Sequence, residues 1–395
     1  MKIKTRLTLI ALLISIGSLY SQSDFREGFI ITNDQDTIQG LVDYRTNSKN
    51  YESCVFKEKA SEKELYPNEI IGFGYANDKF FSSQIIKNVF VEVLVIGDIS
   101  LYKFKDKFLL KKDTAIFELK SELEKIEVNG KIGYKEKSGW RGVITYLISD
   151  CFPNANRFTS GIRLDEKPLT NLIVKYNKCK DSDFTVFKAS KPWTKIDLGA
   201  SIGLTRSEIN TNKEPGSFSY LDKSYNSFDP TIGVLLSISS PRLTENFAFQ
   251  GEFHFMQSSY SSLVKVDGAV VEYHDSYINL TTFTVPLSVK YLFTKGDYGL
   301  YFQAGMNYDY HLKSSTKLLS EQITGNVVNT FPERTAFEVS RGQFGYWGGV
   351  GFHKSYSKFK GSIALRYFQM YGLNSTDGFS SNLNRISINL ILFKK

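Results

Sequence analysis

The stretch that decides the fold is Lys195-Ile196-Asp197-Leu198-Gly199-Ala200-Ser201-Ile202-Gly203-Leu204-Thr205. Its even-numbered residues are all apolar, and its odd-numbered residues are small or polar. Because side chains point alternately to the two sides of a strand, this pattern predicts a β-strand with one apolar face and one polar face.

The same alternation recurs seven more times before the end of the chain. The eight segments are 196–204, 232–238, 247–255, 283–291, 300–308, 344–352, 359–367 and 386–392. In a soluble protein the apolar faces would meet a second sheet, whereas in a membrane barrel they meet lipid and the polar faces line the interior. Eight such strands in series predict an antiparallel transmembrane β-barrel over residues 193–395.

The connections between these segments alternate in length. Segments 240–245, 294–297 and 354–358 are short, whereas 206–229, 257–276, 312–341 and 371–383 are longer and rich in Ser, Asn, Gly and Asp. Outer-membrane barrels have short periplasmic turns and long external loops. We therefore expect both ends of the barrel, and everything before Trp193, on the periplasmic side. The alternative is a soluble β-sandwich or lipocalin-like barrel, which places large apolar side chains inside.

The N-terminus has the three regions of a secretory signal. Lys2, Lys4 and Arg6 precede an apolar run from Leu7 to Ile16, and small residues follow up to Ser21. This run is too short for a membrane helix, so residues 1–21 are predicted to be a signal peptide. Its removal takes away three positive charges, and the net charge of +8 falls to +5. We interpret the remaining basic excess as solvated lysines, with no nucleic-acid partner.

Residues 22–190 form a separate unit in this interpretation. The segments 28–32 and 37–42 flank the turn Asn33-Asp34-Gln35-Asp36 and predict a hairpin. More strands are expected up to residue 119, followed by two amphipathic helices near 140–149 and 167–177, the second capped by Asp165. Strands followed by helices predict a small α+β domain, with residues 181–192 as the linker to the barrel.

Three cysteines remain. Cys151 and Cys179 end the two predicted helices, so antiparallel packing of these helices would bring the two thiols together. In an oxidising periplasm we expect them to form a structural disulfide. Cys54 is then left over and is expected to be buried. No His or Cys lies near these residues at the spacing of a metal site, so no metal is predicted.

Several segments bear a family resemblance. The run 89–102, Val-Phe-Val-Glu-Val-Leu-Val-Ile-Gly-Asp-Ile-Ser-Leu-Tyr, together with the opening 28–40, resembles the N-terminal domain of certain Bacteroidota outer-membrane proteins. Tyr176-Asn177-Lys178-Cys179 resembles the helix that closes that domain, and the rest of the chain resembles the porin-family, PorT-like outer-membrane β-barrel. The resemblance implies a cell outer-membrane location and this fold. It supplies no catalytic residue.

The sequence has no phosphate loop, no zinc-protease motif and no nucleophile elbow, so no cofactor is predicted. The one catalytic candidate is Asp309 with His311, two residues apart on one inward face near the expected outer end of the fifth strand. A carboxylate there could orient an imidazole that activates water, as in a hydrolase at the rim of an outer-membrane barrel. The alternative is a hydrogen-bonded pair in the lumen without catalytic function.

Four more charged or titratable residues face the predicted interior, namely Glu252, His254, Lys290 and Arg366. The interior of an eight-stranded barrel is nearly filled by side chains, and a lone buried charge is costly. We therefore expect these residues to form an ion network that closes the lumen. The competing hypothesis is a narrow polar pore.

Two classes of function remain. The first is a non-enzymatic protein whose barrel, embedded in outer-membrane lipid, anchors a periplasmic domain that binds a periplasmic or outer-membrane protein. The second is a transport, secretion or assembly component that acts through the barrel. The large share of the chain before Trp193 favours the first class.

Overall fold

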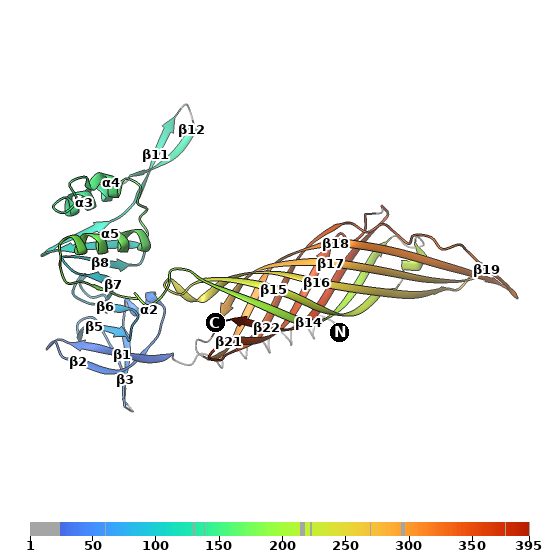
Figure 1. Cartoon of the computed structure of the whole chain (residues 1–395), viewed down its shortest axis with the longest axis horizontal. Helices are drawn as coiled ribbons and strands as arrows, with labels where there is room; N and C mark the ends of the chain where they lie inside the picture. Colours follow the sequence, from blue (N-terminus) through green and yellow to red (C-terminus); the bar gives the residue numbers. More distant parts are fainter. Residues whose placement is uncertain are drawn as a thin grey trace. The chain divides into compact units, whose positions relative to one another are not determined.

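The computed structural model describes residues 24–394 except 60, 129–130, 138, 214–217, 222, 269, 294–296 and 376 (Figure 1). The chain divides into two compact units, with the boundary between Pro192 and Trp193. The predicted signal peptide, residues 1–21, lies outside the described residues. No helix in the described part of the chain is long and apolar enough to cross a membrane.

The first unit is built on one antiparallel sheet. The strand order is β10-β9-β8-β7-β6-β5-β1-β2-β3-β4, and β13 pairs with β7 outside this path. The strands are β1 (Phe25–Thr32), β2 (Thr37–Asp43), β3 (Cys54–Glu58), β4 (Ser61–Leu65), β5 (Ile70–Tyr75), β6 (Phe80–Ser82), β7 (Val91–Ile96), β8 (Ile99–Phe104), β9 (Lys107–Lys112), β10 (Ala115–Leu119) and β13 (Thr185–Val186). The predicted hairpin is the pair β1–β2, with Gly28 opposite Gly40.

In the described part of this unit, the helices that accompany the sheet are α2 (Asn47–Asn50), α3 (Gly139–Ile148), α4 (Ala155–Thr159) and α5 (Glu166–Cys179). The face of α5 predicted from the spacing of its apolar residues is buried and packs into one core with α3 and with β7 to β10. Asp165 is the N-cap residue, but its side chain makes no capping hydrogen bond. A separate hairpin of β11 (Glu122–Val128) and β12 (Lys131–Lys137), which the sequence analysis did not predict, precedes α3.

The predicted disulfide between Cys151 and Cys179 is present. Cys151 follows α3 and Cys179 ends α5, and the two form a disulfide with their Cα atoms 6.3 Å apart. Cys54 is free and buried. Among the described residues, no group of three or more His, Cys, Asp or Glu could hold a metal ion.

The prediction that residues 181–192 form a linker is wrong. Thr185 and Val186 pair with β7, and the Phe187 ring stacks on Phe80 with centroids 5.2 Å apart. The Lys188 ammonium is buried between two carboxylates, 2.7 Å from Glu92 Oε1 and 2.9 Å from Glu166 Oε1. The polar sequence suggested a solvated segment, but its charge is neutralised inside the domain.

The Lys188 cluster joins three parts of the first unit, because Glu92 lies on β7 and Glu166 starts α5. Burial alone would lower the pKa of Lys188, but the two carboxylates outweigh it and raise that pKa. Burial likewise would raise the pKa of Glu166, and Lys188 with Lys103 lowers it. The charged forms are therefore the stable ones, and the segment that leads to Trp193 is part of the domain.

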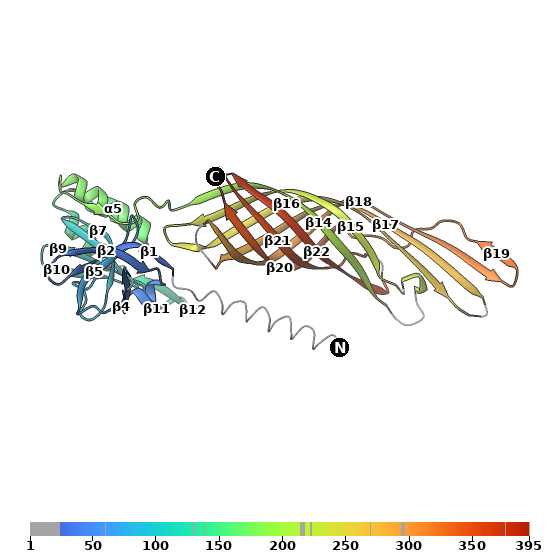
Figure 2. The ribbon, with the colours of Figure 1, turned by 90° about the horizontal axis from the view of Figure 1, so that it is seen from below.

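The second unit is a closed antiparallel sheet of eight strands (Figure 2). They are β14 (Lys195–Lys213), β15 (Tyr225–Ser240), β16 (Thr244–Val266), β17 (Val271–Leu292), β18 (Tyr298–Thr324), β20 (Gly342–Ser355), β21 (Phe359–Tyr371) and β22 (Phe379–Lys394). Pairing of β14 with β22 closes the ring, and β19 (Val327–Thr330) adds a short strand to β18. A β-sandwich is excluded by this closure.

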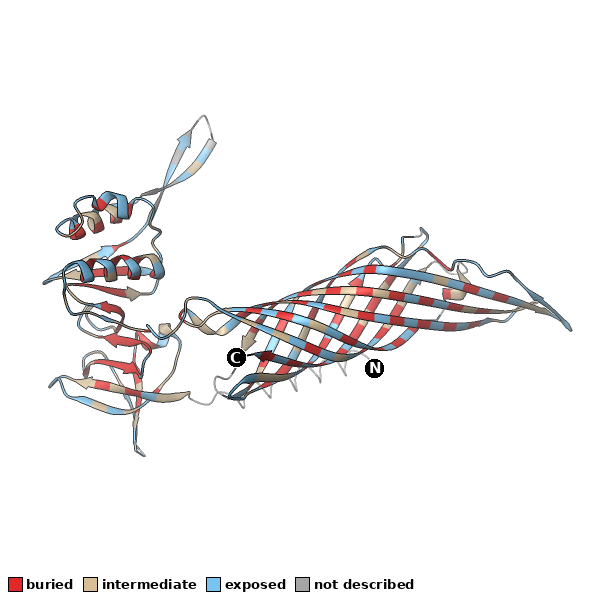
Figure 3. Ribbon diagram, in the orientation of Figure 1, coloured by how far each residue is buried: buried red, intermediate tan, exposed pale blue. Residues whose placement is uncertain are grey.

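The predicted long loops are mostly strand. Segments 257–276 and 312–341 contain the ends of β16, β17 and β18, which pair as far as Val266–Glu272 and Val271–Ile323. The alternation of buried and exposed residues continues through these extensions (Figure 3). These extensions were not predicted from the sequence, because their outward residues, such as Gln257, Ser259 and Lys265, are polar instead of apolar.

The polarity of each face reverses along the strands. On β14 the outward residues are apolar up to Leu204 and polar from Arg206, whereas the inward residues are polar up to Ser207 and apolar at Ile209. Strand β16 reverses in the same way after Phe255, with buried Tyr260 and Val264 in its extension. Lipid favours an apolar outside with a polar inside, and water favours the opposite arrangement. The reversal therefore marks one edge of the apolar band.

The buried Lys188 cluster predicts a strong effect of its removal. Lys188→Met leaves Glu92 and Glu166 buried without their shared cation, which costs about 3–5 kcal/mol of unfolding free energy. We expect faster hydrogen exchange in β7 and α5 of the full-length protein, together with a lower urea midpoint for this unit. The matched control is Lys107→Met, which removes an exposed pair with Glu118 and should cost at most about 1 kcal/mol. Equal effects of the two substitutions would contradict this account.

Candidate functional site

The lumen of the barrel contains a group of buried charges. Glu252, on β16, accepts hydrogen bonds on both carboxylate oxygens: from Gln250 at 2.8 Å, from His254 Nε2 at 2.6 Å and from Arg366 Nη1 at 2.7 Å. Arg366 lies on β21, which is separated from β16 by three intervening strands in either direction around the ring. The ion pair therefore crosses the lumen, and the Arg366 guanidinium lies over the Trp347 ring at 5.0 Å.

A second ion pair crosses the lumen between strands β18 and β22. Arg385 Nη1 donates to Asp309 Oδ2 at 2.6 Å, and Asp309 Oδ1 accepts from Thr284 and Asn307 at 2.8 Å each. Asp309 is fully buried, and Arg385 is nearly so. Arg385 was not included in the predicted ion network, although it belongs to the inward face of the last predicted strand.

The predicted pairing of Asp309 with His311 does not occur. His311 Nε2 donates to Gln343 Oε1 at 3.0 Å, so its Nδ1 accepts from the Thr282 hydroxyl at 2.8 Å. Both ring nitrogens are thus occupied by neutral partners. The expected position at the rim is also wrong, because β18 continues for 13 residues beyond His311. Asp309 and His311 are parts of the packed lumen, with no carboxylate–imidazole dyad.

Lys290 lies apart from the network in which it was predicted. Its ammonium lies 3.7 Å from the centroid of the Tyr301 ring and 5.8 Å from that of Phe393. Among the described residues it forms no ion pair. An aromatic face attracts a cation through its quadrupole, so the cation–π contact stabilises the charge in place of a carboxylate.

Apolar side chains close the lumen on both sides of its polar middle. At the end of the ring where β14 begins and β22 ends, the buried cluster is Leu235, Tyr301, Ala364, Ile391 and Phe393. In the strand extensions, a larger cluster contains Ile209, Leu221, Tyr225, Tyr260, Ile278, Leu280, Leu318, Ala336, Phe337, Met370, Leu373 and Leu383. An eight-stranded ring leaves room for little more than these side chains.

A polar cluster in the strand extensions was also missed by the sequence analysis. His274 Nδ1 lies 2.9 Å from Ser320 Oγ, and its Nε2 lies 3.1 Å from Glu272 Oε2 and 3.3 Å from Ser219 Oγ. Although a Ser, a His and a carboxylate also form hydrolase triads, His274 and Ser320 are cross-strand neighbours in a continuous ladder. Ser219 belongs to the connection between β14 and β15, so the cluster fixes this connection to the strand extensions.

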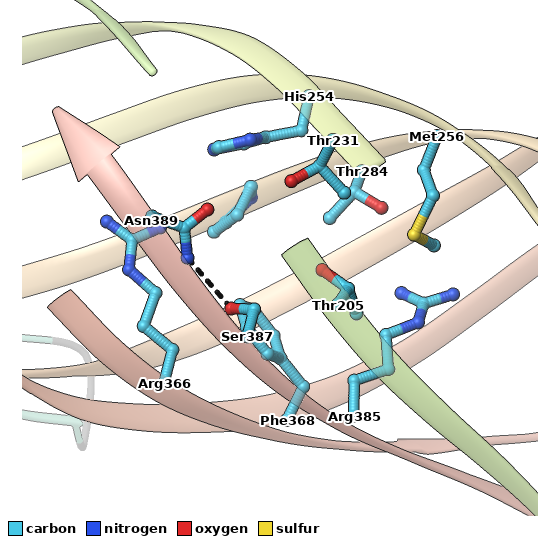
Figure 4. A pocket seen from close by; sticks show the side chains of 11 residues that line it. Thr205, Thr231, His254, Met256, Thr284, Arg366, Phe368, Arg385, Ser387 and Asn389 are labelled. Carbon is cyan, nitrogen blue, oxygen red and sulfur yellow. Dashed lines mark hydrogen bonds between the residues drawn. The ribbon is translucent and has the colours of Figure 1, made fainter. Parts of the chain in front are cut away.

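Between the two ion pairs, the side chains leave a cavity of about 30 Å³ (Figure 4). It is lined by Thr205, Thr231, His254, Met256, Thr284, Pro286, Arg366, Phe368, Arg385, Ser387 and Asn389. This volume corresponds to about one or two water molecules. The lumen is therefore a packed polar interior.

Known proteins offer only distant comparisons. No family model matches the sequence, and no curated protein matches it. Among solved structures, the chain is similar to Neisserial surface protein A (11% identity, 48% of this chain and 96% of that chain, TM-score 0.22). It is also similar to the Ail protein of Yersinia pestis (14%, 50% and 99%, TM-score 0.23) and to the outer membrane protein OprG of Pseudomonas aeruginosa (11%, 52% and 97%, TM-score 0.27). At TM-scores this low, these likenesses carry no argument for the function proposed below.

The second ion pair predicts a non-additive mutational response. Asp309→Asn leaves the Arg385 charge buried without its carboxylate and should cost about 3–5 kcal/mol of unfolding free energy. The double variant Asp309→Asn/Arg385→Met removes both charges and should recover at least about 1 kcal/mol relative to the single variant. Urea unfolding of the barrel in detergent micelles, monitored by its heat-modifiable gel migration, measures the unfolding free energies of the single and double variants. If the effects of Asp309→Asn and of Arg385→Met, each measured alone, add up to the effect of the double variant, the two residues do not form a direct pair.

Proposed function

We propose that the second unit is an outer-membrane β-barrel that does not conduct and that anchors the first unit in the periplasm. The apolar band on its outside supports a lipid environment. Outward residues such as Ile202, Phe249 and Leu390 are more than half exposed, which is costly in water and favourable in lipid. A lipocalin-like barrel would have the opposite arrangement, with its large apolar side chains inside.

The topology supports the orientation. The turns β15–β16, β17–β18 and β20–β21 lie at the same end of the ring as the start of β14 and the end of β22. The opposite end carries the strand extensions and β19. Because outer-membrane barrels have tight turns on the periplasmic side, the chain before Trp193 belongs in the periplasm. The disulfide between Cys151 and Cys179 fits that oxidising compartment.

The closed lumen is the single observation that carries the anchoring function. Two crossing ion pairs fill the middle, and apolar clusters fill the strand extensions and the opposite end. A solute that crossed the barrel would have to break these ion pairs in a medium of low dielectric constant. We therefore propose a non-enzymatic anchor whose periplasmic unit binds a protein partner, and we propose that it belongs with the PorT-like barrels of Bacteroidota that its sequence resembles.

Planar-bilayer recording tests this proposal. Purified protein, with insertion verified by heat-modifiable migration in the same lipid, should show no steady single-channel conductance. The alternative function, transport through the barrel, requires a continuous aqueous path. Reproducible conductance steps that scale with the amount of inserted protein would overturn the anchor and favour a transport or secretion component.

A further inference from the structure

We propose that the cavity between Arg366 and Arg385 is a binding site for a small monovalent anion of the chloride class. The two arginines lie on the neighbouring strands β21 and β22, and both line the cavity (Figure 4). Of the eleven residues that line it, two are arginines and one is a histidine, and none is Asp or Glu. The charges exposed to the cavity are therefore positive.

Unused hydrogen-bond donors support the same conclusion. Each arginine donates from Nη1 to its carboxylate, whereas Nε and Nη2 of both residues are buried and have no hydrogen-bond partner among the described residues. Arg366 and Arg385 are 1% and 3% exposed. Tyr260 lies near Arg385 but does not complete a hydrogen bond with it. A buried charged donor without an acceptor is costly, so these atoms require an acceptor in the cavity.

The neighbouring carboxylates do not supply that acceptor. Both oxygens of Glu252 and both oxygens of Asp309 already accept hydrogen bonds from the residues named above. A third buried carboxylate, Asp229, accepts from Ser227 and does not line the cavity. The lining hydroxyls of Thr205, Thr231 and Ser387 and the amide of Asn389 can add weaker contacts.

The size of the cavity selects the anion. About 30 Å³ accommodates chloride or bromide and excludes sulfate, phosphate and organic carboxylates. A halide accepts hydrogen bonds from several donors at once and has no hydrogens of its own. A water molecule in its place would bring two O–H donors, and the arginine N–H groups around it cannot accept from them. A bound halide would connect the two ion pairs and stabilise the closed lumen.

Thermal unfolding of the full-length protein in detergent tests this site. Sodium chloride and sodium bromide are compared with sodium gluconate at equal ionic strength, so that general screening is the same. The melting temperature should rise saturably with halide, by about 2–4 °C at saturation, which corresponds to a roughly fivefold gain in the ratio of folded to unfolded protein. Identical melting curves in halide and gluconate would overturn the proposal.

Two matched substitutions on β22 locate the effect. Asn389→Asp places a carboxylate at the cavity and should abolish the halide dependence without lowering the melting temperature in gluconate. Asn384→Asp is the control, because Asn384 lies on the outward side of the same strand and contacts the Tyr367 hydroxyl. It should retain the full halide dependence. If both variants keep the dependence, the halide binds elsewhere and the proposed site is wrong.

Anomalous diffraction locates the bound ion directly. Crystals grown in sodium bromide should show an anomalous peak between the guanidinium groups of Arg366 and Arg385. Density without an anomalous signal there would identify water and overturn the anion site. Either result leaves the non-conducting anchor untouched, because that proposal depends on the lumen that the ion pairs and the apolar clusters fill without the anion.

Discussion

The pairing of β14 with β22 is the constraint on which the second unit depends. A sheet exposed to lipid cannot leave backbone donors and acceptors unpaired at an edge, since no water is present to satisfy them. Fifteen register pairs, from Gly199–Phe393 to Lys213–Phe379, close that edge. Closure puts one face of every strand outside and the other into a narrow lumen, and in the proposed lipid environment the polar residues are forced inside. Buried charges then have to be paired across the lumen, as Glu252–Arg366 and Asp309–Arg385 are.

Much of this could be predicted from the sequence, because the apolar outward residues recur with a period of two. Ile196, Leu198, Ile202 and Leu204 are all outward and exposed, as their alternation required. The prediction failed where the outward residues change from apolar to polar. Beyond Leu204 and Phe255 the same strands continue with polar outward residues and an apolar core inside, and a pattern defined by apolar outward residues cannot detect them. The predicted lengths of β16, β17 and β18 and the predicted position of His311 at the rim were therefore wrong.

The candidate site was predictable only in part, for a similar reason. Alternation shows which residues point inward, and it correctly brought Glu252, His254 and Arg366 to one interior. It does not show which residues of non-adjacent strands meet, because this depends on the stagger of the ring. Lys290 thus contacts the Tyr301 ring instead of Glu252, and Asp309 pairs with Arg385. In the first unit, Lys188 was predicted to lie in a linker, because its carboxylate partners Glu166 and Glu92 are 22 and 96 positions away in the sequence.

The most direct test of the account is the side of the membrane on which each unit lies. Single cysteines at Val328 in β19 and at Tyr134 in β12, both well exposed, are treated in intact cells with a membrane-impermeant maleimide. The native background is low, because Cys151 and Cys179 are joined and burial raises the pKa of Cys54 to about 12. The account predicts that Val328→Cys is labelled in intact cells and that Tyr134→Cys is labelled only after the outer membrane is permeabilised. Labelling of Tyr134→Cys in intact cells, with Val328→Cys protected, would contradict it.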